Sequence, residues 1–367
     1  MEVGSLSESI RVPIVRPHRV NGKPLQVNGK ARMRDVAKLA KVSTMTVSRV
    51  LSGAVPVAEE TRNRVFRAIE VLNYQPNQLA RALRGSRSHM IGVLMPYLYD
   101  PFFAMCAHSI NMVAQKYNYS VSFTTTNENS KTEFEEIRHM MRRQVDGIIV
   151  IPTVDGNSVL STAEFHDLPI VTLDRPAPRT RFDSVTCDNK TGGQIATEHL
   201  LEHGHNSICY LGISDELYTF RMRFNGYETA MKKKGLKPEA FFDCRTMELV
   251  HDLLRNLIKR KKPPTALFTA NGLTTRFALR GMAMLGVSVP HDMAIIGFDE
   301  PELSEVLRSP LTVVRQPVQE LGRVAAELLF ERLNNGKAQP PRRNIVLPVD
   351  LIVRESCGCG PHRAATQ

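Results

Sequence analysis

The sequence has no tryptophan, and it also lacks long apolar runs and paired cysteine motifs, two absences that argue against particular classes of protein. No apolar stretch approaches the roughly 18–20 residues that a membrane-spanning helix requires, so no membrane partner is expected. The six cysteines are scattered, and no CxxC motif has a matching second pair, which disfavours a zinc site or a disulfide framework. "CGC" at 357–359 could contact a metal, but we favour free thiols near a tail.

Signals for export and for common enzyme chemistry are also missing. The first thirty residues contain no continuous apolar segment typical of a secretory signal, so we expect a cytoplasmic, nucleoid-associated protein. The sequence holds no GxxxxGK[ST] phosphate loop, no GxGxxG after the first expected strand, and no GxSxG or HExxH. The two glycines of "CDNKTGGQ" are interpreted as part of a helix start. We therefore expect no catalytic residue, no cofactor and no metal.

What the sequence does have is positive charge, concentrated in its first quarter. Residues 1–90 contain 16 lysines and arginines against 6 acids, whereas the remaining residues contain 32 against 31. This asymmetry predicts a basic head that binds a polyanion, followed by a nearly neutral body. A basic solvated tail would have the same composition, so charge alone does not decide between them.

Three short helical patterns follow residues 1–30, which mix Pro, Gly, Asn and basic residues without a period and are predicted to be disordered. The first, Met33–Ala40, places small apolar residues on one face. The second starts after Ser43, a predicted N-cap, and stops near Gly53. The third lies within residues 57–74 and has acids in its first turn. Its predicted inward side chains, with those of the other two, are Val36, Ala37, Ala40, Val47, Val50, Leu51, Val65, Ile69 and Leu72.

Two helices joined by a tight turn, the second rich in small polar residues, predict a helix-turn-helix whose second helix enters the DNA major groove. Hydroxyl groups can reach phosphates or base edges, Met45 can contact a thymine methyl, and Arg49 can reach guanine or phosphate. Alternatively, the hydroxyls only cap the helix and Arg49 is solvated; the basic head favours DNA. The candidate contacts are Ser43, Thr44, Met45, Thr46, Ser48 and Arg49.

From Met90 onward, short apolar runs rich in β-branched residues alternate with amphipathic segments. The runs predict strands buried on both faces of a parallel sheet, at 90–96, 121–127, 146–152, 169–174, 206–212, 264–271 and 293–299. The alternation favours βαβ units with right-handed crossovers. Because one sheet would be too large, we predict an α/β fold with two Rossmann-like lobes and a ligand cleft at the carboxyl ends of their strands.

"RDVAKLAKVSTMTVSRVLSG", with "VAEETRNRVFRAIEVLNYQPNQLARALRG" after it, resembles the headpiece of the lactose-repressor/galactose-repressor family of bacterial transcription regulators. "PIVTLDRP", "RFNGYETAM" and "MAIIGFDE" are similar to landmarks of that family's core, so the resemblance covers about residues 32–356. It implies a periplasmic-binding-protein-like core with parallel sheets. The implied organisation is a tail at 1–30, a helix-turn-helix headpiece at 31–75, a hinge helix and linker at 76–88, an effector-binding and dimerisation core at 89–356, and a C-terminal tail at 357–367.

The resemblance also assigns roles on the DNA side. Thr44 and Met45 would set operator preference, Arg49 would contact a base or phosphate, and Arg34 would face the groove. The hinge residues Asn77, Ala80 and Leu83 would dock in the minor groove, with the leucine wedged into a base step. A helix this short is marginal in water, so it should order only against DNA and a partner. Without the family pattern, Leu83 would be taken as an ordinary packing residue.

For the effector cleft, the resemblance points to Phe103, Asp174, Arg223, Asn271 and Asp299. All except Phe103 are expected at or just beyond the end of a strand. Each has a simpler alternative, for instance a surface role for Arg223, a turn role for Asp299 and a core role for Phe103. Many family members have Asn-Asp where this chain has Asn-Gly at 271–272, which weakens the inference there.

Together these features predict a ligand-responsive repressor. It would act as a homodimer, or a tetramer, on a pseudo-palindromic double-stranded operator, because one helix-turn-helix reads only a half-site. The effector would be a small sugar or a sugar acid such as gluconate. The main alternative is a transport-type sugar-binding protein of the same bilobal fold, but such a protein would need a secretory signal and no basic headpiece.

Overall fold

The computed structural model describes residues 31–52, 56–74, 87–154, 159–165, 167–176, 182–335 and 341–359. The chain separates into two compact units, Met1–Ser86 and Arg87–Gln367. The predicted tail at 1–30 and the hinge residues Asn77, Ala80 and Leu83 lie outside the described residues. Among those that are described, no helix is long and apolar enough to cross a membrane.

The first unit contains three helices, α1 (Met33–Ala40), α2 (Thr44–Ser52) and α3 (Glu59–Val71). Helix α1 ends at Lys41, whose φ of 52° places it in the left-handed region and turns the chain toward α2. The inward residues predicted for α1 are confirmed. The shared core of the three helices contains Val36, Ala37, Ala40, Val47, Val50, Val65, Ala68 and Tyr74, with Leu51, Ile69 and Leu72 partly buried against it.

Ser43 caps α2 as predicted. Its Oγ accepts a hydrogen bond from the N–H of Thr46 at 3.1 Å, and its carbonyl accepts from the N–H of Val47. The cap satisfies backbone donors that have no partner inside the helix, which explains why a small hydroxyl residue precedes the apolar stripe.

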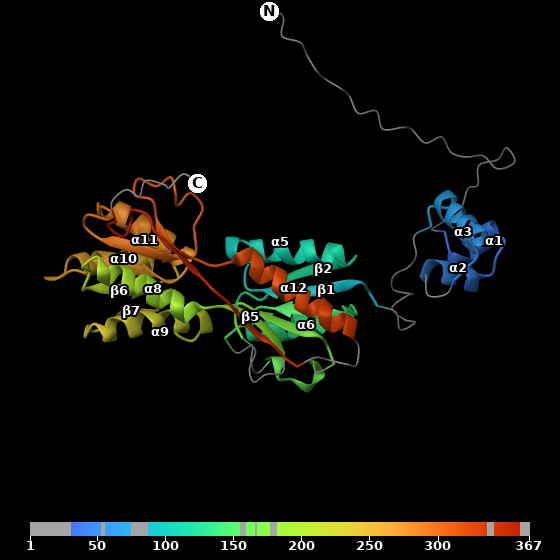
Figure 1. Ribbon diagram of the computed structural model, residues 1–367, viewed down its shortest axis with the longest axis horizontal. Helices are drawn as coiled ribbons and strands as arrows, with labels where there is room; N and C mark the ends of the chain where they lie inside the picture. Colours follow the sequence, from blue (N-terminus) through green and yellow to red (C-terminus); the bar gives the residue numbers. More distant parts are fainter. Residues whose placement is uncertain are drawn as a thin grey trace, which may run out of the picture. The chain divides into compact units, whose positions relative to one another are not determined.

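The second unit consists of two lobes, each with six described strands and helices on the sheet faces (Figure 1). The first sheet has the order β11-β5-β4-β3-β1-β2. Its strands are β1 (Met90–Met95), β2 (Ser120–Thr125), β3 (Gly147–Val150), β4 (Ile170–Leu173), β5 (Asp183–Cys187) and β11 (Asn344–Leu347). The first lobe also contains α5 (Pro101–Lys116), α6 (Ser130–Arg142), the short helix η1 (Ala163–Phe165) and α12 (Val318–Asn335).

The second sheet repeats this order as β12-β10-β9-β8-β6-β7. Its strands are β6 (Ile208–Leu211), β7 (Glu239–Phe241), β8 (Ala266–Thr269), β9 (Ala294–Phe298), β10 (Thr312–Arg315) and β12 (Asp350–Ile352). Its helices are α8 (Asn189–Glu202), α9 (Tyr218–Lys233), α10 (Met247–Ile258) and α11 (Gly272–Met284). The described strand pairs are parallel, as predicted, apart from β10 with β12, which is antiparallel.

Over the described residues, the chain crosses between the lobes three times. It leaves the first lobe after β5 and enters α8, which packs on the second sheet. It returns after β10 through α12, which packs on the first sheet, and it crosses again between β11 and β12. The last of these crossings lies in the red C-terminal segment of Figure 1. Such crossings allow the two lobes to move relative to each other about a few residues.

The seven predicted strands are present as β1, β2, β3, β4, β6, β8 and β9. The other five were not predicted as strands. Of these, β7 and β12 have three residues each and β11 is only half-buried. The strands β5 (DSVTC) and β10 (TVVR) are buried but mix polar with apolar residues. The predicted C-terminal tail also starts too early. Cys357 is fully buried, so the folded core continues past residue 356.

A buried ion pair ties α12 to β5 in the first lobe. Arg332 donates from Nε to Oδ2 of Asp183 at 2.6 Å and from Nη2 to Oδ1 at 2.8 Å, and both side chains are at most 1% exposed. Burial alone would raise the pKa of Asp183, but the hydrogen bonds from Arg332 and from the N–H of Arg343 outweigh it and lower the pKa. The carboxylate therefore stays charged without contact with water.

We expect Arg332→Met to destabilise the core by about 3–5 kcal/mol, because it leaves the Asp183 carboxylate buried and without its cation. Arg323→Ala is the matched control: this arginine also lies on α12 and pairs with acids, but it is exposed to solvent. Removal of the Arg323 side chain should lower the free energy of unfolding by no more than about 1 kcal/mol. Urea unfolding followed by circular dichroism would measure both, and equal effects would contradict this account.

Candidate DNA-reading surface and effector pocket

The N-terminal half of α2 presents polar groups and one apolar side chain to solvent. Ser43 and Thr44 are exposed, and Met45 is 64% exposed although it is large and apolar. Thr46 and Ser48 are half-buried at the side of this face. Most of the Met45 side chain is thus accessible for contact with another molecule.

Two arginines predicted to contact DNA are exposed as well. Arg49 lies one turn after Met45 on α2, and the Arg34 side chain on α1 is 70% exposed and 4.0 Å from the Asp35 carboxylate. The structure therefore places the described candidate DNA contacts at the surface of the headpiece while Val47 and Val50 anchor α2 from behind.

The five predicted effector residues line one cavity of about 230 Å³ between the lobes of the core. Asp174 and Asp299 follow β4 and β9, and Asn271 is the N-cap of α11, just after β8. Phe103 lies in the first turn of α5, where its ring meets that of Phe102 edge to face at 5.2 Å. The carboxyl ends of the parallel strands meet here, which is where such sheets bind ligands.

Asp174 and Asp299 occupy equivalent positions in the two lobes. Their φ angles are 65° and 71°, and each donates its N–H at 2.9 Å to the neighbouring strand, to Val185 and Val314 respectively. Aspartate tolerates this left-handed backbone better than most residues. Burial raises the pKa of Asp174 to about 6, although the guanidinium groups of Arg175 and Arg223 oppose the rise.

Arg223 is not at a strand end, as the sequence suggested, but in the second turn of α9. Its Nε donates to Oδ1 of Asn189 at 2.8 Å, and its Nη1 donates to the carbonyl of Ala270 at 2.6 Å. Its Cζ lies 3.7 Å from the centre of the Phe298 ring, and its Nη1 lies 4.0 Å from Oδ2 of Asp299. These contacts hold the guanidinium in one orientation at the cavity wall.

Arg223 reaches the strand ends because α8 and α9 touch along their backbones. A Cβ on Gly193 would lie 2.1 Å from the carbonyl oxygen of Arg223, and a Cβ on Gly226 would lie 2.0 Å from that of Lys190. Only glycine fits at either position. The glycines of "CDNKTGGQ" thus belong to α8, as predicted, and Asp188 caps this helix by accepting from the N–H of Thr191.

Gln316 is a pocket residue that the sequence did not reveal. It follows β10 at the second crossing between the lobes, and its Nε2 donates to Oδ1 of Asp299 at 2.5 Å. Its Oε1 accepts from Sγ of Cys187, at the end of β5 beside the first crossing, at 2.9 Å. The strand-end position would have indicated Gln316 if β10 had been recognised as a strand.

Arg175 and Glu128 form the wall of the cavity in the first lobe. Nη1 and Nη2 of Arg175 donate to the two oxygens of Glu128 at 2.8 and 2.6 Å, and Nη1 also donates to the carbonyl of Pro152 at 2.7 Å. The sequence analysis did not single out Arg175. Its position directly after Asp174 was the one feature of the sequence that could have indicated a place at the cavity. The other side chains lining the cavity are mostly aromatic or charged, and include Tyr97, Tyr99, Asp100, Phe102, Phe220, Arg245 and Arg276.

A wider cavity of about 750 Å³ adjoins the inner one. The two share several lining residues, among them Asp100, Leu273, Arg276, Asp299 and Gln316. The wider cavity therefore borders the same crossing segment that carries Gln316.

Another buried carboxyl, that of Glu133 on α6, is influenced by the charge of Arg175. Its Oε2 accepts from the N–H of Thr153 at 2.7 Å, while its Oε1 has no hydrogen-bond partner among the described residues. Burial raises the pKa of Glu133 to about 7, although Thr153 and Arg175 oppose the rise. The Glu133 carboxyl therefore changes its protonation state near neutral pH.

We expect Glu133 to make the core less stable as pH rises. Its pKa rises from 4.5 to about 7 on folding, so the folded state binds more protons between these values, and stability is lost until pH exceeds 7. The full effect is about 3 kcal/mol. Glu133→Gln should remove this pH dependence. Between pH 5 and pH 8 the free energy of unfolding of the wild type should therefore fall relative to that of the variant. A pH-independent difference would contradict the assignment.

Comparison with known proteins places these features in one family. The model described as "Bacterial regulatory proteins, lacI family" matches residues 32–77, and that described as "Periplasmic binding protein-like domain" matches residues 197–357. The HTH-type transcriptional repressor PurR of Aliivibrio fischeri strain MJ11 is 33% identical over 334 residues, which cover 89% of this chain and 98% of that protein.

Two further comparisons agree. The ribose operon repressor of Halalkalibacterium halodurans is 32% identical over 326 residues, covering 88% of this chain and 96% of that protein. The crystal structure of the lac repressor dimer bound to operator and the anti-inducer ONPF shares the fold, with a TM-score of 0.77 and 23% identity over 90% of this chain and 99% of that chain. The chain belongs to the lacI family of bacterial regulatory proteins and is a DNA-binding transcriptional repressor.

Proposed function

We propose that this repressor is a homodimer whose affinity for a pseudo-palindromic operator is controlled by a small sugar or sugar acid bound between the lobes of its core. One observation carries the proposal: Asp174, Arg223 and Asp299 converge on a single cavity that also contains Gln316, a residue of the crossing between the lobes. The cavity thus joins ligand-binding groups to the segments about which the lobes can move.

The chemistry of the cavity suits a polyhydroxylated ligand. Carboxylates such as Asp174 and Asp299 accept hydrogen bonds from hydroxyl groups, and the oriented guanidinium of Arg223 donates them. Aromatic rings such as Phe103 and Phe220 offer flat apolar faces to a sugar ring. The volume of about 230 Å³ lies below the roughly 300–1,000 Å³ typical of drug-sized ligands, which favours a compact metabolite.

A carboxylate on the ligand would find cations at the same cavity. Arg276 is exposed on α11 and lines both the inner and the wider cavity, and Arg245 lines the inner one. Four acids and four arginines contribute to the inner cavity, so a neutral sugar and a sugar acid such as gluconate both match its charge. Arg276 would discriminate between them, because its charge would stabilise only the anion.

Ligand binding would change the DNA affinity through the relative position of the lobes. A ligand that bridges Asp174 of the first lobe and Asp299 of the second favours one lobe arrangement, and Gln316 and Cys187 lie at the crossings that must adjust. Such coupling between two sites is typically worth about 1–3 kcal/mol. The hinge residues Asn77, Ala80 and Leu83 are proposed to dock in the minor groove and to transmit this change.

Each headpiece would read one half-site, with α2 in the major groove. Thr44 and Met45 would contact base edges, and Arg34 and Arg49 would contact bases or phosphates. A dimer with two-fold symmetry then requires an operator with matching symmetry.

The ligand proposal predicts the outcome of a thermal-shift screen. A matching sugar or sugar acid at 100 times its Kd should stabilise the protein by about 2.7 kcal/mol. Arg223→Ala should abolish the shift. Arg276→Ala should weaken the binding of sugar acids while leaving neutral sugars unaffected. If neither class of compound shifts the melting temperature of the wild type, the proposed effector class is wrong.

The DNA proposal predicts that Arg49→Ala weakens operator binding by about 1–3 kcal/mol per half-site. Effector binding should stay unchanged, because Arg49 belongs to the other compact unit. Arg67→Ala, which removes an exposed arginine from α3, controls for the loss of charge. Fluorescence anisotropy with labelled operator would measure both variants. Equal losses for the two would mean that α2 is not the reading surface.

A further inference from the structure

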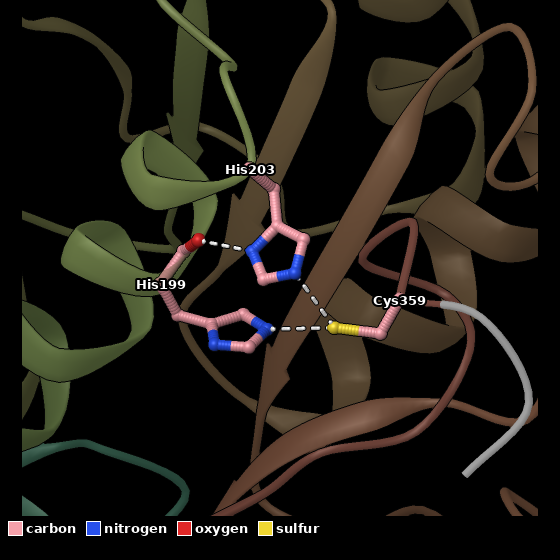
Figure 2. A group of neighbouring side chains, drawn as sticks. All are labelled: His199, His203 and Cys359. Carbon is pink, nitrogen blue, oxygen red and sulfur yellow. Dashed lines mark hydrogen bonds between the residues drawn. The ribbon is translucent and has the colours of Figure 1, made fainter.

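Three side chains with metal-binding atoms converge at the far end of α8, away from the effector cavity (Figure 2). His199 lies in the last turn of α8, His203 caps that helix, and Cys359 comes from the segment after β12. The Nε2 atoms of His203 and His199 lie 2.9 and 3.4 Å from Sγ of Cys359. The three ligand atoms lie within 4.8 Å of one another.

The hydrogen bond on the other side of His203 orients its ring. Nδ1 of His203 lies 2.8 Å from the carbonyl oxygen of His199, and a carbonyl can only accept, so Nδ1 carries the proton. In the neutral ring, Nε2 is then the nitrogen with a free lone pair, and it faces Cys359 (Figure 2). A histidine that donates one ring N–H to a carbonyl and offers the other nitrogen is typical of metal sites.

The spacing of the ligand atoms also matches a small ion. In a tetrahedral zinc site the metal–nitrogen and metal–sulfur distances are about 2.0–2.3 Å, which places neighbouring ligand atoms roughly 3.3–3.6 Å apart. The 3.4 Å distance from Cys359 to His199 is close to that spacing, whereas the 2.9 Å distance to His203 is shorter. The latter contact would have to open by roughly half an ångström to admit the ion.

We propose that His199, His203 and Cys359 form a binding site for a zinc-class transition metal ion. Two imidazole nitrogens and one thiolate suit Zn²⁺ and exclude Mg²⁺ and Ca²⁺, which prefer oxygen ligands. Cys357 lies next to the site, with Sγ 3.2 Å from Nε2 of His199, but it is buried and also accepts from Oγ1 of Thr312 at 3.2 Å. The proposal replaces the sequence-based expectation of free thiols and no metal.

The ion would join the segment after β12 to α8. Helix α8 starts at Asn189, which accepts the hydrogen bond from Arg223, so both ends of this helix would be held in place. A metal that binds the folded state but not the unfolded chain stabilises the fold. Zn²⁺ should therefore raise the melting temperature of the full chain.

The test uses the full chain without an affinity tag, reduced and stripped of metal with a chelator. Titration with Co²⁺ should show one ion per chain, a thiolate-to-cobalt charge-transfer band and the intense visible bands of tetrahedral cobalt. Zn²⁺ should abolish this spectrum by displacing the Co²⁺. Absence of the charge-transfer band, or binding of much less than one ion per chain, would overturn the proposal.

Variants assign the ligands. Cys359→Ser should lose the charge-transfer band, and His203→Ala should weaken Zn²⁺ binding at least about tenfold and remove its effect on the melting temperature. His139→Ala, a helical histidine on α6 paired with Glu136, should behave like the wild type. The melting temperature without metal checks that each variant folds. A band retained in Cys359→Ser would overturn the assignment of that ligand.

Discussion

The backbone contact between α8 and α9 is the constraint on which the effector cavity depends. Gly193 and Gly226 leave no room for a Cβ, because the carbonyl oxygens of Arg223 and Lys190 occupy that space. With the helices this close, the guanidinium of Arg223 reaches Asn189, Ala270 and the face of Phe298 from the second turn of α9. A wider spacing would withdraw the cation from the strand ends. The same helix α8 carries His199 and His203 at its other end, so its position also sets the proposed metal site.

The buried charges of the core divide into two groups with different consequences. Asp183 with Arg332 and Glu128 with Arg175 are paired through two parallel hydrogen bonds, so their charges are compensated and they hold elements together. Asp174 and Glu133 are compensated less completely, and burial raises the pKa of both. Asp174 lines the cavity, where a ligand hydroxyl would donate a hydrogen bond to its carboxylate. Such incomplete compensation is frequent at functional sites.

Local patterns predicted the headpiece and the buried strands well. The cap of α2 at Ser43, the inward stripe of Val36, Ala37 and Ala40, and the seven apolar runs all depend on residues close in sequence. The placement of Arg223 at a strand end was wrong: it lies on α9, and it reaches the cavity only through a helix–helix distance that no local pattern reports. Short or half-exposed strands such as β7, β11 and β12 carry little hydrophobic signal and escaped recognition. The buried strand β10 was also not recognised, so the residue after it, Gln316, was missed.

The sequence by itself determined the family, the two-part organisation and the identity of the five side chains that line one cavity. The family and the two parts follow from the motifs and the location of the charge, whereas the five side chains follow from the resemblance to that family. Three of them, Asp174, Asn271 and Asp299, lie after strands, whose carboxyl ends parallel sheets bring to one edge. Only the tertiary structure decided how the cavity is linked to the lobe crossings through Gln316 and Cys187, and that Cys359 lies beside His199 and His203. Those groups are separated by more than a hundred residues in the chain, and packing of complete sheets and helices is what brings them within hydrogen-bond distance.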